Sequence, residues 1–152
     1  SLLRAVHEVN VETRKQFVKK ITKHFGTLKG KKIAILGLAF KPDTDDMREA
    51  PSIDIIEALL GDGASVVAYD PIAVKKAQLK LPKDVAYAKD PYEAVDGADA
   101  VAVITEWNEF RQLDLVRLAR GMRNLVLFDG RNIYEPEKVR ALGFMYYGVG
   151  RM

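Results

Sequence analysis

Two cationic side chains, Lys41 and Arg48, lie in the charged loop Gly37–Arg48, which leads into a predicted helix. Pro51 has a fixed φ that suits a first helical turn, and the hydroxyl of Ser52 is expected to cap the free N–H groups there. Amino ends of helices attract anions, and Lys and Arg are the cations most used on phosphates. The pattern therefore predicts an anion-binding loop in which the two cations form a diphosphate clamp.

The same loop has a purely structural interpretation. Lys41 and Arg48 would then only neutralise the acidic residues near them, and the charge pattern alone favours neither interpretation. The loop is not a dinucleotide fingerprint, because no further glycine follows Gly37 at the required spacing. The acids also lack calcium-loop spacing, since the fifth and sixth positions from Asp43 are Met47 and Arg48. We expect no metal site.

Other side chains with possible chemistry follow later apolar stretches. Arg131 comes directly after one such stretch and next to Gly130, so it is a ligand candidate; its structural alternative is an ion pair with Asp129 or Glu135. Asp70 could bind a ribose, although Pro71 beside it favours a turn. Trp107 could stack on a base or sugar, although packing is the more common role of a single tryptophan.

Composition excludes several classes of chemistry. The chain has no cysteine, so it offers no disulfide, thiolate metal site or cysteine nucleophile. Both histidines, His7 and His24, fall in the amino-terminal segment, which argues against a Ser-His-Asp or histidine-metal arrangement. The chain therefore has few general bases to offer.

The charge pattern and the hydropathy limit the classes of partner that this chain is expected to bind. Residues 1–32 contain nine Lys or Arg against Glu8 and Glu12, but without interleaved aromatic residues. A solvated helix face explains this better than nucleic-acid binding. No apolar run approaches the roughly 20 residues that cross a bilayer, and no signal peptide is evident. We predict a cytoplasmic protein with neither nucleic-acid nor membrane partners.

The elements that must position these side chains begin with a long amphipathic helix over residues 1–26. Its apolar stripe has helical spacing, and Gly26 is a plausible stop. Such a helix is longer than a domain of this size needs for its own cover, so it is expected to serve as a connector or as an oligomer element. The stripe comprises Val6, Val9, Thr13, Phe17, Ile21 and Phe25.

Residues 27–152 alternate short apolar strands with helical stretches. This order predicts a doubly wound α/β domain with a mostly parallel sheet and helices on both faces. Ligands bind such sheets beyond the carboxyl ends of the strands, where the candidate residues lie. The expected strands are 33–36, 65–69, 85–88, 100–104, 125–128 and 144–147, and the expected helices are 53–60, 73–80, 92–95, 113–120 and 136–141.

The run Gly37–Pro51 resembles the signature of the nucleotide-sugar dehydrogenases, the family of the UDP-glucose and GDP-mannose dehydrogenases. Further motifs resemble the carboxyl-terminal domain of that family in the same order, and Ala5–Asn10 extends the likeness to the first helix. The motifs are Tyr69-Asp70-Pro71, Asp90-Pro91-Tyr92-Glu93-Ala94, Thr105-Glu106-Trp107 and Phe128-Asp129-Gly130-Arg131-Asn132.

The resemblance implies a Rossmann-like domain that binds the nucleotide diphosphate, joined to a central dimerisation helix. Phe40, Lys41 and Arg131 would contact the UDP-sugar, and Arg48 would reach NAD. Arg14 would be contributed to the site of the partner subunit. In this family, a separate amino-terminal domain binds NAD and supplies the catalytic cysteine. Its reaction oxidises the sugar C6 alcohol to an acid with two hydride transfers to NAD.

The leading hypothesis is therefore the UDP-binding part of an NAD-dependent UDP-glucose 6-dehydrogenase, inactive without the cysteine of the other domain. Relatives acting on UDP-N-acetylmannosamine or GDP-mannose are alternatives within the family. Two hypotheses lie outside it. One is a stand-alone module for a nucleotide or coenzyme A, and the other is a domain that serves only to dimerise.

Overall fold

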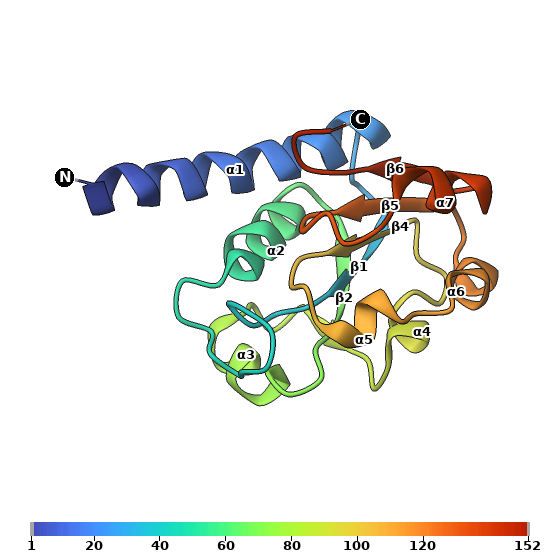
Figure 1. The fold of residues 1–152 in the computed structure, drawn as a ribbon. Helices are drawn as coiled ribbons and strands as arrows, with labels where there is room; N and C mark the ends of the chain where they lie inside the picture. Colours follow the sequence, from blue (N-terminus) through green and yellow to red (C-terminus); the bar gives the residue numbers. More distant parts are fainter. Residues whose placement is uncertain (1, 152) are drawn as a thin grey trace.

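The computed structural model describes residues 2–151, with side chains described from residue 11 onward. A long helix, α1 (Leu2–Phe25), precedes an alternation of strands and helices (Figure 1). The strands are β1 (Lys32–Leu36), β2 (Ser65–Tyr69), β3 (Ala86–Tyr87), β4 (Ala100–Val103), β5 (Val126–Asp129) and β6 (Met145–Tyr147). The other helices are α2 (Pro51–Gly61), α3 (Val74–Lys80), α4 (Pro91–Ala94), α5 (Asn108–Arg111), α6 (Leu115–Gly121) and α7 (Pro136–Ala141).

The strands form one sheet in the order β3-β2-β1-β4-β5-β6, and every pair is parallel. The chain moves outward from β1 to β3 and then returns to β4 on the other side of β1. The predicted doubly wound, Rossmann-like class is therefore confirmed. The direction of winding changes between β1 and β4, which is where such sheets bind ligands.

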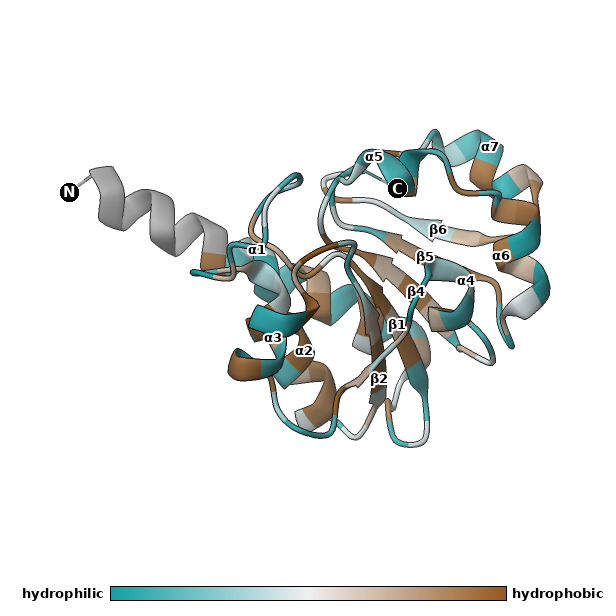
Figure 2. Ribbon diagram, turned by 90° about the horizontal axis from the view of Figure 1, so that it is seen from below, coloured by the Kyte–Doolittle hydropathy of each residue, from teal (hydrophilic) through white to brown (hydrophobic). Residues whose placement is uncertain are grey.

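Helices cover both faces of the sheet. Helices α1 to α3 lie over one face and α4 to α7 over the other (Figure 1). Ile33 and Ile35 of β1 point into the first cluster, whereas Ala34 and Leu36 point into the second. This double burial explains why the strands are almost wholly apolar, as the hydropathy colouring of β1, β2 and β4 shows (Figure 2).

The second half of α1 packs against the domain. Phe17 and Ile21 are buried, and the Phe17 ring meets Phe128 edge to face at 6.4 Å between ring centres. Near the helix end, His24 Nδ1 lies 2.7 Å from the hydroxyl of Tyr147. Gly26, with φ 75°, follows the helix as predicted. Val6 and Val9 of the predicted stripe lie outside the residues whose side chains are described.

Several predicted boundaries shift for local reasons. The third strand shrinks from 85–88 to Ala86–Tyr87, an edge strand that pairs only with β2. Helix α6 starts later than predicted because the Asp114 side chain caps Val116 and Arg117. Helix α5 was not predicted, since a single turn leaves no periodic pattern. None of the described helices has the length and hydropathy needed to cross a membrane.

Candidate functional site

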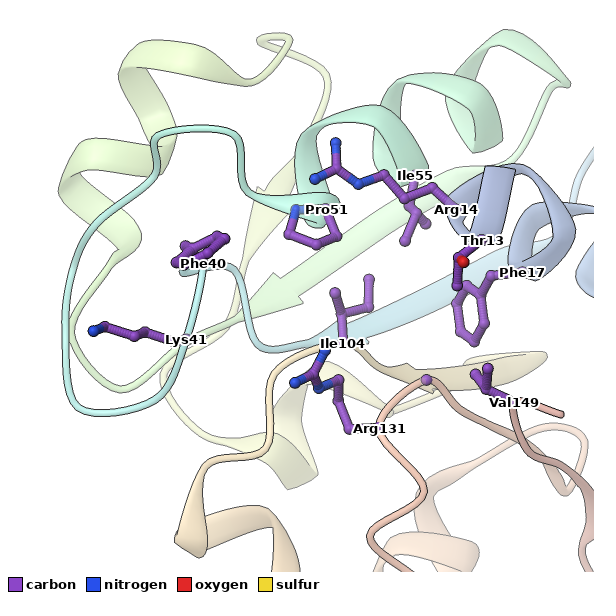
Figure 3. A pocket seen from close by; sticks show the side chains of 11 residues that line it. Thr13, Arg14, Phe17, Phe40, Lys41, Pro51, Ile55, Ile104, Arg131 and Val149 are labelled. Atoms are coloured by element: carbon purple, nitrogen blue, oxygen red, sulfur yellow. The ribbon is translucent and has the colours of Figure 1, made fainter. Parts of the chain in front are cut away.

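A cavity of about 340 Å³ opens at the carboxyl edge of the sheet, and four of the predicted site residues line it (Figure 3). Phe40 and Lys41 come from the loop after β1, Arg131 from the loop after β5, and Arg14 from α1. The chain positions that converge there are far apart in sequence. The remaining lining residues are Thr13, Phe17, Pro51, Ile55, Ile104, Gly130 and Val149.

The cavity combines positive charge with an apolar wall. Arg14, Lys41 and Arg131 are cationic, and none of the described lining residues is acidic. The first residue of α2, Pro51, also lines the cavity, so the positive end of a helix dipole lies beside these cations. Phe17 and Ile55 contribute apolar surface. Such a site suits an organic anion with an apolar part, such as a nucleotide.

The loop after β1 contributes Phe40 and Lys41 to the cavity wall. The Phe40 N–H donates to the carbonyl of Asp46 at 2.8 Å, which closes the loop on itself, and Asp43 adopts a left-handed φ of 64°. The Phe40 side chain is 50% exposed and Lys41 is exposed as well. Among the described residues, no acid lies within ion-pair distance of Lys41. Its ammonium is thus available to a ligand.

Arg48 lies away from this cavity. Its guanidinium pairs with Asp46 at 2.9 Å, and its side chain is 85% exposed. Hydrogen bonds from Arg48 lower the pKa of the Asp46 carboxyl to about 2. A separate surface hollow places Arg48 near Lys76 and Lys80. Lys41 and Arg48 therefore do not converge on one point. Arg48 neutralises a nearby acid, Asp46, as the structural interpretation of the loop predicted.

Arg131 forms an ion pair with Glu106, which follows β4. The Arg131 side chain pairs with neither Asp129 nor Glu135. Only its backbone N–H reaches Asp129, at 3.3 Å, and Glu135 pairs with Lys138 instead. The structural alternative, an ion pair with Asp129 or Glu135, is therefore not formed, because β4 and β5 are neighbours and bring Glu106 beside Arg131.

Asp129 sets the shape of the loop that holds Arg131. This carboxylate is fully buried and accepts hydrogen bonds from the backbone N–H groups of Ile133 and Tyr134 and from the hydroxyl of Tyr146. Burial, followed by the bond to Asp129, raises the pKa of Tyr146 to about 12, so this phenol remains a donor at neutral pH. The loop after β5 is thus anchored from within the core.

Arg14 contacts its own chain in this structure. Its Nη1 lies 2.5 Å from Asp54 Oδ2, and its Nη2 donates to the carbonyl of Glu49 at 2.7 Å. Its Nε is buried and has no hydrogen-bond partner among the described residues. Arg14 thereby joins α1 to the start of α2. Its assignment to a partner subunit stays a prediction.

Three further predictions concern residues behind the cavity. Asp70 Oδ1 accepts the backbone N–H groups of Ile72 and Ala73, so the turn interpretation is confirmed. Trp107 is 8% exposed and belongs to the core, which confirms packing rather than an open stacking surface. The predicted cap was wrong: Ala50 is the N-cap of α2, and the Ser52 hydroxyl is buried and donates to the carbonyl of Leu38 at 2.6 Å.

The sequence patterns missed part of the site. Phe17 was predicted only as a member of the helical stripe, and Val149 was not singled out at all. Glu106 was named only as part of the motif Thr105-Glu106-Trp107, without a partner. Its position directly after a predicted strand was the only sequence signal for a role at the site. Its pairing with Arg131 could not be predicted without knowing that β4 and β5 are neighbours in the sheet. In the described part of the chain, no cluster of three or more acidic or histidine side chains could hold a metal ion.

An open parallel sheet with a cationic cavity at its switch point defines a Rossmann-like nucleotide-binding domain. Residues 34–136 match the model of the UDP binding domain of the UDP-glucose/GDP-mannose dehydrogenase family. The chain belongs to this family, as its resemblance predicted.

Curated relatives support this assignment. A UDP-glucose 6-dehydrogenase from Pseudomonas aeruginosa is 44% identical over 99% of this chain and 34% of its own length. One from Rhizobium meliloti is 50% identical over 83% of this chain and 29% of its own length. A solved UDP-glucose dehydrogenase from Pyrobaculum islandicum matches with a TM-score of 0.82 and 34% identity, over 98% of this chain and 32% of that one. The chain spans about a third of the length of these relatives.

Proposed function

We propose that this chain is the UDP-binding part of an NAD-dependent UDP-glucose 6-dehydrogenase. The observation that supports it best is the convergence of Arg14, Lys41 and Arg131 on one cavity beside the amino end of α2. A diphosphate needs several cations or N–H donors on different sides, which one loop alone could not supply. The identity to two UDP-glucose 6-dehydrogenases favours UDP-glucose over other nucleotide sugars.

Each cavity residue has a distinct role in this proposal. Lys41 and Arg131 bind the diphosphate from two loops, and Phe40 offers its exposed ring to the apolar part of the ligand. Glu106 neutralises Arg131 when no anion is present. Arg14 completes the positive wall and joins α1 to α2. These residues bind and orient; none supplies a nucleophile.

The cofactor belongs to the whole enzyme. When bound there, NAD would supply the hydride acceptor for oxidation of the C6 alcohol of the sugar. In this chain, the exposed Arg48 fits a role toward NAD, because it lies outside the substrate cavity and its hollow also contains Lys76 and Lys80. A catalytic cysteine must come from another part of the enzyme, since this chain has none.

We also propose that the enzyme is a cytoplasmic homodimer, with residues 1–26 as the dimerisation helix and residues 27–152 as the UDP-sugar domain. A groove of about 750 Å³ runs between α1 and α2 and includes the apolar residues Val11, Val18 and Ala58. Sedimentation velocity at two concentrations tests this proposal. Wild type should dimerise and Val11→Glu should not; a wild type that stays monomeric at both concentrations contradicts it.

The ligand proposal is tested by isothermal titration of the chain with UDP, UDP-glucose and GDP. Wild type should bind the uridine compounds more tightly than GDP, and Lys41→Ala with Arg131→Ala should abolish binding. Lys83→Ala with Arg120→Ala is the matched control, because it removes the same charge from exposed residues at the opposite edge of the sheet. Wild type that binds no UDP would leave only the stand-alone or dimerisation hypotheses.

A further inference from the structure

Leu38 and Ala39 lie between β1 and the cavity residues Phe40 and Lys41. Every backbone N–H and carbonyl group of these two residues forms a hydrogen bond with a side chain. The N–H groups of Leu38 and Ala39 donate to Asp70 Oδ2 at 2.8 and 3.1 Å. The Leu38 carbonyl accepts the Ser52 hydroxyl at 2.6 Å, and the Ala39 carbonyl accepts the Thr105 hydroxyl at 2.8 Å.

The three side chains come from three different places in the fold. Asp70 follows β2, Thr105 follows β4, and Ser52 lies in the first turn of α2. All three are buried, with exposed fractions of 3%, 2% and 0%. We refer to Ser52, Asp70 and Thr105 as the loop clamp. Burying polar groups costs free energy unless they are paired, so this concentration of them on one dipeptide indicates a requirement for fixed geometry.

Asp70 is the centre of the loop clamp. Besides the two N–H groups of the dipeptide, its Oδ2 accepts the indole N–H of Trp107 at 3.2 Å, and its Oδ1 accepts Ile72 and Ala73. One carboxylate therefore ties the loops after β1, β2 and β4 together across the switch point of the sheet. Bonds from five donors compensate the buried charge.

Close packing strengthens the same junction. Gly37, with φ 97°, lies against Thr105, and a Cβ atom on Gly37 would lie 2.6 Å from both the Cβ and the backbone nitrogen of Thr105. This contact thus fixes the direction in which the loop leaves β1. Phe40 and Lys41 follow directly, so any movement at Leu38–Ala39 would be passed on to the cavity.

We propose that the loop clamp positions Phe40 and Lys41 for the ligand, with Asp70 as the principal positioning residue. This inference rests on the proposed function, because its effect is read through the UDP site. Asp70 does not line the cavity and acts through the backbone. A ligand group held within a fraction of an ångström loses affinity when its support is loosened.

The test compares Asp70→Asn with Asp99→Asn. Asp99 is an equally buried carboxylate at the other edge of the sheet, where it accepts the Lys32 N–H at 2.9 Å and the Asn124 amide at 2.9 Å. Both variants should lose stability in urea. Only Asp70→Asn should bind UDP about tenfold more weakly and show faster hydrogen exchange at the Leu38 and Ala39 amides.

Thr105 provides a second variant in case Asp70→Asn does not fold. Thr105→Val removes the hydroxyl at nearly constant volume and should weaken UDP binding, and Thr105→Ser should restore it. UDP affinity that is unchanged in Asp70→Asn and Thr105→Val, or lowered equally in Asp99→Asn, overturns the inference. If wild type itself does not bind UDP, the proposed function fails, and unchanged exchange at Leu38 and Ala39 in Asp70→Asn would separately refute the loop clamp.

Discussion

The guanidinium of Arg131 forms an ion pair with the carboxylate of Glu106, across the neighbouring strands β4 and β5. This pair stands beside the cavity, so a bound anion competes with Glu106 for the same cation. Glu106→Gln should therefore strengthen UDP binding about two- to fivefold, the range expected for a partly exposed ion pair. Isothermal titration checks this, with Glu137→Gln on α7 as the control; weaker binding in Glu106→Gln would show that the pair serves orientation rather than competition.

The Asp46–Arg48 pair predicts a measurable pH dependence. The pKa of the Asp46 carboxyl is lowered from 3.8 to about 2 by its hydrogen bonds to Arg48. A lowered carboxyl pKa stabilises the folded loop above pH 4 and loses that contribution as the pH falls toward 2. The carboxyl carbon of Asp46, followed by NMR, should titrate near pH 2 in wild type and near the ordinary value in Arg48→Ala. Identical midpoints in the two proteins would contradict the pair.

Gly37→Ala should destabilise the fold by about 3 kcal/mol, because it adds a clash with Thr105 to a left-handed backbone. Gly61→Ala is the matched control. Gly61 is the last residue of α2, and a Cβ atom there meets nothing within 4 Å. That change should be neutral or stabilising by up to about 1 kcal/mol. Urea unfolding measures both, and equal midpoints would show that the contact with Thr105 does not constrain the loop.

Arg14→Ala should lower the free energy of unfolding by about 1–2 kcal/mol. The change removes two hydrogen bonds between α1 and the start of α2, one to Asp54 and one to the Glu49 carbonyl. Arg120→Ala, at an exposed position on α6, should change stability by less than about 0.5 kcal/mol. Urea unfolding followed by circular dichroism compares the two. No difference between them would mean that Arg14 does not contribute to the docking of α1.

Much of the fold could be predicted from local patterns. Apolar strands alternating with helices indicated a parallel sheet, and parallel strands bring their carboxyl ends to one edge, so Lys41, Thr105 and Arg131 could be assigned to one rim. The resemblance of the loop motifs identified the family that the comparisons then showed. Helix α5 and the role of Ser52 could not be predicted, because single turns and buried hydroxyls leave no periodic signal.

The sequence by itself determined the order of elements, the apolar strands and the identity of the rim residues, because these depend on periodicity and on residue type. Only the tertiary structure decided which rim residues act together. Lys41 belongs to the cavity wall whereas Arg48, in the same loop, pairs with Asp46 outside it. Arg131 pairs with Glu106 rather than with Asp129 or Glu135, which are nearer to it in the sequence. The reason is that left-handed turns and bonds between distant segments set the path of each loop: bonds to Asp70 fix the loop after β1, and bonds to Asp129 fix the loop after β5.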